Sequence, residues 1–338
     1  MIAHNRPTLG QAELEAAARV LSSGWVAQGK EVEQFEQEVC DYLELDRGHA
    51  VALSSGTAAL FLALWALGAR GKRVAIPVYS CAAVRNAVLM SGGEPRPIDV
   101  AEDSPNMDLA QIGEERAELA VIAHIFGIPS RFACAEFSIP LIEDCAQSFG
   151  ARIDGRAVGL DGAAGIFSFY ATKMFTAGGQ GGMLVSRDSS IVAAVRDYRE
   201  FDCRRDQKPR FNLQMTDLQA AIGRAQLSSL DSFIRRRREI DARYREAGLP
   251  MWPHDLQSGL EANCYRAIVR TTGAERMIRS LSDAGITAIV PIADWELLDE
   301  GQSVRARALA RSTVSLPIYP SLRDSAVADV INVASHLK

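Results

Sequence analysis

Short apolar runs recur along the first part of the chain, and stretches with helical spacing of hydrophobic residues separate them. Hydrophobic residues over 58–67 and 81–90 favour helices between the runs. Strands that are apolar throughout are buried on both faces, so the pattern predicts a mostly parallel sheet with helices on both sides. The strands are expected at residues 50–53, 73–78, 95–100, 119–125, 140–144, 164–169 and 182–186.

The remainder of the chain predicts a smaller α+β domain. Its strands are expected at residues 265–270 and 286–290, and its helices at 275–284 and 326–334. The expected fold is therefore α/β, with a large sheet domain over residues 1–240 and a small C-terminal domain over 241–338.

Two capping-box patterns predict helix N-termini. Thr8 with Gln11 precedes the first helical pattern, and Thr216 with Gln219 precedes a later one. A charged helix follows over residues 231–246, and its four consecutive arginines at 235–238 are typical of a solvated helix face.

The composition narrows the class of protein. The chain has 338 residues, enough for about two domains. Its 37 Lys and Arg against 42 Asp and Glu give a net charge of −5, which argues against a protein that coats nucleic acid or an acidic membrane. The longest apolar stretch, 58–68, is too short to span a bilayer, and the first residues lack the layout of a signal peptide. We expect a cytoplasmic protein without nucleic-acid or membrane partners.

The cysteines support a reduced compartment. They are scattered singly, without a Cys-x-x-Cys pair or a histidine at zinc spacing, so we expect free thiols and no metal site. The six are Cys40, Cys81, Cys134, Cys145, Cys203 and Cys264.

Ser54-Ser55-Gly56-Thr57 lies between an expected strand and an expected helix. Gly56 and Thr57 at a helix N-terminus offer free backbone N–H groups at the positive end of the helix dipole, which suits a phosphate. The alternative is an ordinary turn with Thr57 as the N-cap.

Asp144 ends an expected strand, in Glu143-Asp144-Cys145-Ala146-Gln147. Ligands of open α/β sheets bind at the carboxyl ends of the strands, and a carboxylate there suits a cationic ring nitrogen or a metal. The alternative is a solvated strand end or the cap of the next turn.

Lys173 stands in Phe169-Tyr170-Ala171-Thr172-Lys173, before a cluster of glycines. Burial disfavours the ammonium form of a lysine, and a neutral amine is a nucleophile able to form a Schiff base. The alternative is a structural lysine that extends to the surface. The three segments together provide a phosphate cradle, a carboxylate for a pyridine nitrogen and a Schiff-base lysine, the groups that hold pyridoxal 5′-phosphate.

Four motifs resemble the DegT/DnrJ/StrS family of sugar aminotransferases, which have the fold type I of aspartate aminotransferase. They are Ser-Ser-Gly-Thr-Ala-Ala-Leu, Glu-Asp-Cys-Ala-Gln-Ser-Phe-Gly-Ala, Phe-Ser-Phe-Tyr-Ala-Thr-Lys and Asn-Leu-Gln-Met-Thr-Asp-Leu-Gln-Ala-Ala-Ile-Gly. With Leu-Pro-Ile-Tyr-Pro-Ser-Leu near the end, the resemblance extends over nearly the whole chain.

The resemblance implies roles for particular residues. Lys173 would be the Schiff-base lysine and proton carrier, and Asp144 would keep the pyridine nitrogen protonated. Gln147 would lie near the cofactor ring, and Gly56, Thr57 and Ser168 would contact its phosphate. Asn212 would reach the phosphate of the neighbouring subunit, which implies a homodimer with active sites at the subunit interface.

Two departures from the family pattern concern the site. Cys81 stands where relatives have an aromatic residue against the cofactor ring, and a thiol has no π face. Gln214 stands where relatives have an arginine. A lysine at 173 favours transamination, since relatives that dehydrate their substrates have histidine there.

We therefore expect a pyridoxal-phosphate aminotransferase that moves an amino group from an amino acid, L-glutamate by resemblance, to a nucleotide-linked keto-sugar. The alternatives are a cyclitol or a non-sugar ketone as acceptor, or a non-catalytic regulatory protein with the same fold. His124 ends an apolar strand, where it would either line the pocket or be a hydrogen-bonded core residue.

Overall fold

The computed structural model describes residues 1–132, 136–254, 258–299 and 301–336. Within these residues the main sheet has seven strands in the order β1-β9-β8-β5-β4-β2-β3. Neighbouring strands pair in parallel except β9, which is antiparallel to both β1 and β8. The seven predicted strands form this sheet, as β1 (Ala50–Leu53), β2 (Arg73–Pro77), β3 (Glu94–Ile98), β4 (Leu119–Ala123), β5 (Leu141–Asp144), β8 (Ala164–Ser168) and β9 (Gly182–Val185).

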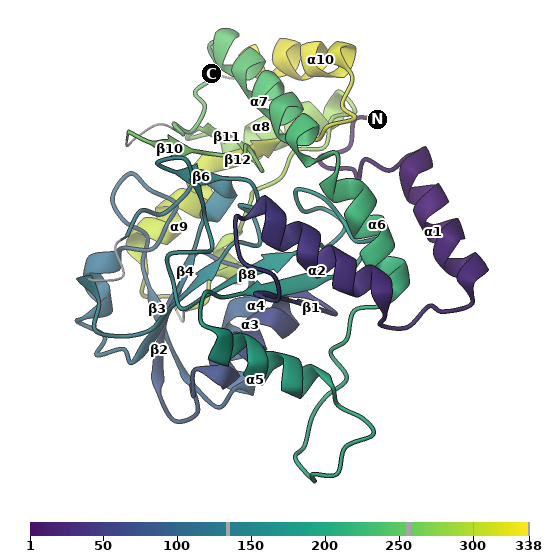
Figure 1. The fold of residues 1–338 in the computed structure, drawn as a ribbon. Coiled ribbons are helices and arrows are strands. Elements are labelled where there is room, and N and C mark those ends of the chain that lie inside the picture. Colours follow the sequence, from purple (N-terminus) through teal and green to yellow (C-terminus); the bar gives the residue numbers. More distant parts are fainter. Residues whose placement is uncertain (133–135, 255–257, 300, 337–338) are drawn as a thin grey trace.

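Helices cover both faces of the sheet, as the sequence predicts (Figure 1). Successive residues of a strand point to opposite faces. Accordingly Ala50 and Ala52 of β1 belong to one hydrophobic core, and Val51 and Leu53 belong to the other. The first core lies under α2 (Lys30–Tyr42) and α6 (Asp217–Leu227), and the second under α3 (Gly56–Ala66), α4 (Ala82–Met90) and α5 (Ser189–Arg199).

The C-terminal part has a core of its own. It lies between α7 (Leu230–Glu246), α8 (Ala274–Asp283), α10 (Asp324–Ser335) and the antiparallel pair β11 (Ala267–Arg270) and β12 (Thr313–Leu316). Residue 240, the predicted domain boundary, falls inside α7, and that boundary stays a prediction. The remaining elements are α1 (Gln11–Ser23), α9 (Val304–Ser312), β6 (Arg152–Ile153), β7 (Arg156–Ala157), β10 (Leu260–Glu261) and short 3-10 turns.

The strand predicted at 286–290 is wrong. Ile286 forms an isolated bridge with Ile2, and Ile289 forms one with Ser315. The segment therefore makes two single bridges and no continuous strand. The partner of β11 is instead β12, whose alternating Thr-Val-Ser-Leu sequence is buried on both faces.

One predicted capping box is confirmed and the other is wrong. Thr216 Oγ1 accepts a hydrogen bond from Gln219 N at 3.2 Å, and Gln219 Oε1 accepts one from Thr216 N at 3.0 Å. The first helix is capped instead at Gly10, whose N–H donates to Glu13 Oε2 at 2.6 Å. Thr8 lies before the cap, and its hydroxyl donates to Ser321 Oγ at 3.3 Å.

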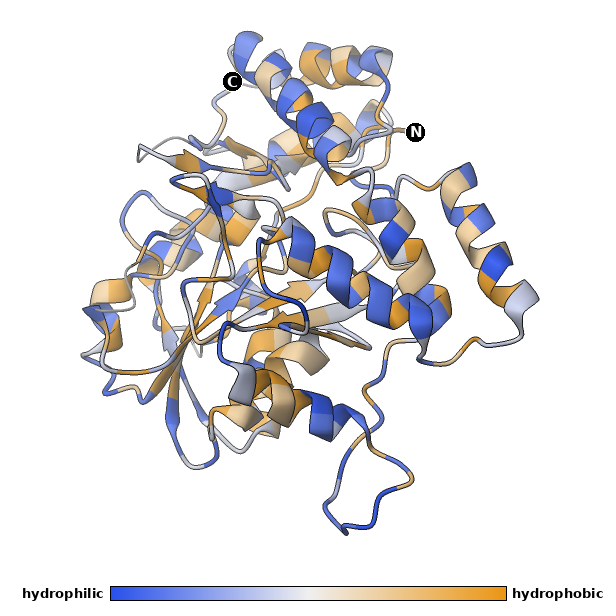
Figure 2. Cartoon of the chain, viewed as in Figure 1, coloured by the Kyte–Doolittle hydropathy of each residue, from blue (hydrophilic) through white to orange (hydrophobic). Residues whose placement is uncertain are grey.

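The solvated face predicted for the arginine run is wrong at one position. Arg237 is 1% exposed, and its Nη1 donates to the carbonyl oxygens of Tyr265 at 3.2 Å and Ile318 at 2.9 Å. Burial lowers the pKa of Arg237 to about 10. A run of four residues exceeds one helical turn, so one of its members must face the core that α7 covers. Figure 2 shows α7 as largely hydrophilic.

An N-terminal segment crosses between the C-terminal part and the main sheet. Ile2 N donates to Gly285 O at 2.8 Å, and Thr287 N donates to Ile2 O at 2.9 Å. Three residues later, Asn5 Nδ2 donates to Thr172 O at 3.0 Å. The segment therefore joins the small sheet region to the residue before Lys173.

Of the predicted free thiols, those of Cys40, Cys81, Cys145, Cys203 and Cys264 are confirmed. Cys134 lies outside the described residues. Among the described helices, none has both the length and the hydrophobicity that a bilayer-spanning helix requires.

A buried ion pair ties α2 and α5 to the sheet. Glu36 is 5% exposed; its carboxylate accepts from Ala52 N at 2.8 Å and Arg196 Nη1 at 3.0 Å. Arg199 Nη1 also donates to this carboxylate and is buried with it. Three elements thus meet on one carboxylate.

We predict that Glu36→Ala lowers the free energy of unfolding by about 3–5 kcal/mol, because it removes the buried carboxylate that Arg199 pairs with. The control is Glu94→Ala, which removes an exposed ion pair with Arg96 and is expected to cost less than about 1 kcal/mol. Urea unfolding of both variants measures the difference; equal small losses would contradict the prediction.

Candidate active site

A cavity of about 640 Å³ lies where β5 and β8 end and α3 begins. Parallel strands carry their carboxyl ends to one edge of a sheet, which is where ligands of open α/β sheets bind. The structure brings together there seven of the eight site residues predicted from sequence: Gly56, Thr57, Cys81, Asp144, Gln147, Ser168 and Lys173.

The N-terminus of α3 forms one wall of the cavity. Ser55 is the N-cap, and its Oγ accepts from Ala58 N at 3.1 Å, so the alternative with Thr57 as N-cap is wrong. The Thr57 side chain is exposed and lines the cavity. The first N–H groups of a helix have no partner within the helix, so this wall suits an anion.

Gly56 lets α3 approach β8 closely. A Cβ added at Gly56 would lie 2.8 Å from Ser168 Cβ, closer than packed side chains approach one another. The absence of a side chain therefore brings the first turn of α3 and the Ser168 hydroxyl to the same part of the cavity. Backbone N–H groups and hydroxyls of this kind are donors suited to a phosphate.

Asp144 ends β5 and is buried at the cavity wall. One carboxylate oxygen accepts from Ala146 N at 3.0 Å. Burial raises the pKa of Asp144, and this exceeds the opposite effects of the Ala146 N–H, Lys173 and His124. A carboxylate in this position gains from a cationic partner brought by a ligand.

Glu143, the preceding residue, points into the opposite core. Its carboxylate accepts from the N–H groups of Gly159, Asp161 and Gly162, each at 2.8 Å. His124 Nε2 lies 3.1 Å from the same carboxylate, and His124 Nδ1 accepts from Ser130 N at 2.9 Å. Of the two interpretations of His124, the hydrogen-bonded core residue is confirmed.

Lys173 is half-buried in the loop that follows β8. Its backbone N–H donates to Tyr170 O at 2.9 Å, and its side chain lines the cavity. Lys173 Nζ lies 5.5 Å from the centroid of the Tyr265 ring. The amine thus faces an aromatic wall.

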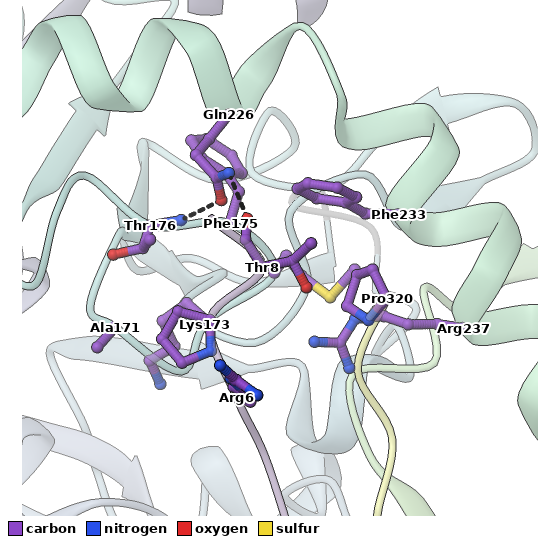
Figure 3. Close-up of a pocket in the computed structure, with 12 residues that line it drawn as sticks. Arg6, Thr8, Ala171, Lys173, Phe175, Thr176, Gln226, Phe233, Arg237 and Pro320 are labelled. Atoms are coloured by element: carbon purple, nitrogen blue, oxygen red, sulfur yellow. Dashed lines mark hydrogen bonds between the residues drawn. The ribbon is translucent and has the colours of Figure 1, made fainter. Parts of the chain in front are cut away.

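The loop that carries Lys173 packs against α6 and the N-terminal segment (Figure 3). Gln226 of α6 accepts from Thr176 N at 3.4 Å and donates to Thr8 O at 2.8 Å. Lys173 also lines the small hollow drawn in Figure 3, together with Arg6 of the N-terminal segment. Lys173 therefore lies between the cavity in front and this packed region behind.

Gln147 and Cys81 occupy other parts of the wall. Gln147 Oε1 accepts from Phe126 N at 2.8 Å, which fixes the side-chain amide and leaves its NH₂ group as a donor. Cys81 is exposed and is the N-cap of α4. The aromatic nearest in sequence, Tyr79, is buried in the core against Phe126 rather than placed on the cavity.

Asn212 is the predicted site residue that the structure places elsewhere. It is exposed, and its Oδ1 accepts from Gln214 N at 3.1 Å. Neither residue lines the cavity.

The sequence pattern gives Tyr265 and Arg266 only as the start of a strand, but both line the cavity. Tyr265 is buried beside Lys173, and the Arg266 guanidinium lies 5.2 Å from the centroid of the same ring. An aromatic and a cation before a strand carry no signal of function until the fold brings them beside the lysine. The segment 291–298 also contributes Trp295, which is 84% exposed, and Glu296.

The sheet and the cavity define an α/β protein with the fold of pyridoxal-phosphate aminotransferases. The chain belongs to the DegT/DnrJ/EryC1/StrS aminotransferase family, whose sequence profile matches residues 7–335. The resemblance noted in the sequence is thereby confirmed, and so are the fold class and the assignment to aminotransferases.

Individual relatives are consistent with this family assignment. The chain is 32% identical over 341 residues to dTDP-3-amino-3,4,6-trideoxy-alpha-D-glucose transaminase of Streptomyces venezuelae, covering 92% of this chain and 88% of the relative. The structure superimposes on aminotransferase TlmJ from Streptoalloteichus hindustanus with a TM-score of 0.93, at 32% identity over 100% and 99% of the two chains. Its fold also matches the PLP form of sugar aminotransferase Spr1654 from Streptococcus pneumoniae, with a TM-score of 0.87 and 22% identity over 99% and 97%.

Tyr265 generates a prediction on pH dependence. Burial alone would raise the pKa of its phenol, but Lys173, Arg266 and Arg237 outweigh burial and lower the pKa to about 8. Burial raises the pKa of Tyr42 to about 12.

We therefore expect the absorbance of tyrosinate in the cofactor-free protein to increase by one tyrosine near pH 8. The proton leaves because the phenolate is stabilised by the surrounding cations, so Lys173→Ala should move this step to higher pH. Tyr265→Phe is the control, in which the step should disappear. A step near pH 8 that persists in Tyr265→Phe would refute the assignment.

Proposed function

We propose that this protein is a pyridoxal-phosphate-dependent aminotransferase that transfers an amino group from L-glutamate to a nucleotide-linked keto-sugar. The observation that carries the proposal is the convergence of Lys173, Asp144 and the N-terminus of α3 on one cavity. The membership of the family supports the reaction type, and the Streptomyces venezuelae relative supports a sugar as acceptor.

The residues present fit the cofactor. The first turn of α3 with Thr57 and Ser168 would bind its phosphate, and Asp144 would bind its pyridine nitrogen. Asp144 is suited to a protonated nitrogen because it is buried and one hydrogen bond from Ala146 leaves its charge largely unbalanced. Gln147 would donate to an oxygen on the ring from its free NH₂ group.

When bound, pyridoxal phosphate supplies an electron sink for the carbon that loses its α-proton, and it carries the amino group between donor and acceptor. Lys173 Nζ would take that proton and return it, since it is the amine on the cavity wall. Asp144 would hold the proton on the ring nitrogen, and the aromatic face of Tyr265 would limit the positions open to Lys173 Nζ.

The experiment is a visible absorption spectrum of the purified protein with added pyridoxal phosphate, before and after L-glutamate. We expect a yellow band that fades with L-glutamate and returns with 2-oxoglutarate. In Lys173→Ala the fading should be slowed by about 10²–10⁴-fold, the contribution of a positioned proton carrier.

Lys30→Ala is the control, because Lys30 is exposed at the start of α2 and should react like the wild type. A Lys173→Ala protein with normal turnover would overturn the proposal. A yellow wild-type band that no amino acid changes would favour a binding role over catalysis.

We propose further that the active unit is a homodimer in which Asn212 contacts the phosphate site of the neighbouring subunit. The exposed position of Asn212, away from its own cavity, supports this arrangement. We also propose a cytoplasmic location, with which the free thiols of the described cysteines agree.

Mixing two impaired variants, Asn212→Ala and Lys173→Ala, tests the shared site. Asn212→Ala should weaken cofactor binding by about 10- to 100-fold, the effect of losing a hydrogen bond to a charged group. In a random mixture with Lys173→Ala, the hybrid dimer would combine an intact Lys173 with an intact Asn212 in one site. At limiting cofactor the mixture should recover about a quarter of the wild-type rate. No recovery above the mean of the two variants would show that Asn212 acts within its own subunit or not at all.

A further inference from the structure

The cavity carries more positive charge than the cofactor uses. Besides Lys173, the guanidinium groups of Arg85 and Arg266 line it, and neither forms an ion pair with a carboxylate of the described residues. The acidic lining residues are Asp144, which the cofactor would engage, and Glu296, whose Oε2 already accepts from Ala293 N at 2.8 Å. A site with this balance attracts an anionic substrate.

Arg266 shares an aromatic neighbour, Tyr265, with Lys173. Its guanidinium carbon lies 5.2 Å from the centroid of the Tyr265 ring, and Lys173 Nζ lies 5.5 Å from the same centroid. Both charges therefore border one aromatic side chain. Arg266 is half-buried at the base of β11, so packing against the ring restricts its position.

Among the described residues, the hydrogen-bond partner of the Arg266 guanidinium is His4, which does not neutralise it. Arg266 Nη1 lies 3.0 Å from His4 Nε2, which also lies 2.9 Å from Ser315 Oγ. Burial lowers the pKa of His4 to about 3, with further lowering by Arg266 and Arg237. His4 is thus neutral and orients one edge of the guanidinium, leaving Nε and Nη2 without a partner among the described residues.

We propose that Arg266 binds the α-carboxylate of the amino-acid donor. This inference rests on the proposed aminotransferase function and assigns a specificity residue within it. In an α-amino acid the carboxylate is attached to the carbon that bears the amino group, so its binding site must lie close to Lys173. A guanidinium edge with two free N–H donors matches the two oxygens of a carboxylate.

The position of Arg266 favours the donor over the acceptor. In a nucleotide-linked sugar, the sugar ring separates the phosphates from the carbon that is aminated. An anion-binding group that borders the same aromatic ring as Lys173 therefore corresponds to the donor carboxylate, and phosphates would lie farther from the lysine. The half-reaction with an amino donor alone separates these cases, because it contains no acceptor.

The first test measures how fast L-glutamate bleaches the cofactor band, over a range of glutamate concentrations. In Arg266→Gln the glutamate concentration for half-maximal rate should rise by about 10- to 100-fold, as for a lost hydrogen-bonded charge. The band itself and the limiting rate should change much less. The matched control is Arg270→Gln on the same strand, an exposed residue that pairs with Asp103 and should leave the half-reaction unchanged.

The second test replaces the carboxylate of the donor. The wild type should prefer L-glutamate over its α-carboxamide by a similar factor, and Arg266→Gln should lose this preference. Arg266→Lys keeps a cation without the planar pair of donors, so it should restore part of the preference. A merely structural role for Arg266 would weaken both donors equally.

The outcomes separate the two proposals. A wild type that reacts with glutamate, together with an Arg266→Gln variant that saturates at the same concentration, would overturn the role of Arg266 and leave the proposed function standing. A wild type whose band no amino acid bleaches would overturn both. If Arg266→Gln fails to fold, Arg266→Lys decides, because unchanged saturation and preference there would likewise refute the assignment.

Discussion

The parallel pairing of β5 with its neighbours is the constraint on which the cavity depends. In register, Asp144 lies beside Ala123 of β4 and Ile166 of β8, so the chain leaves all three strands at the same edge. The antiparallel β9 extends this order, because Gly182 is in register with both Leu53 and Ser168. The start of α3 is thereby brought to the strand end that leads to Lys173. A change in this register would separate the phosphate wall, the carboxylate and the amine at once.

Two adjacent carboxylates at the end of β5 have opposite environments. Burial would raise the pKa of Glu143, but His124 and backbone N–H donors outweigh burial and hold the pKa below its usual value. Asp144 has fewer donors, and burial raises its pKa. Because side chains alternate along a strand, the two carboxylates have different roles. Glu143 holds the loop 159–162 from the core side, and Asp144 lines the cavity.

The sequence predicted the main sheet well because its strands are short and apolar. Seven of the eight predicted site residues lie at the ends of those strands or within a few residues after them, so the sheet pattern also brought them together. Its failures have physical causes. The alternating Thr-Val-Ser-Leu strand β12 carries a weak signal, and the inward turn of Arg237 depends on which face of α7 meets the core. Tyr265 and Arg266 are many residues from Lys173 in the chain, and only the fold brings Lys173 and Arg266 to the same aromatic ring.

The crossing of the N-terminal segment has a consequence for the order in which the protein matures. Asn5 supports the loop of Lys173, yet the same segment is held by Gly285 and Thr287, which the ribosome adds long afterwards. Contacts between residues so far apart in sequence form late, since the intervening chain must first be ordered. The sheet and the wall formed by α3 are therefore able to assemble while synthesis continues. The lysine loop reaches its final support after the C-terminal part has folded, so competence for catalysis is acquired last.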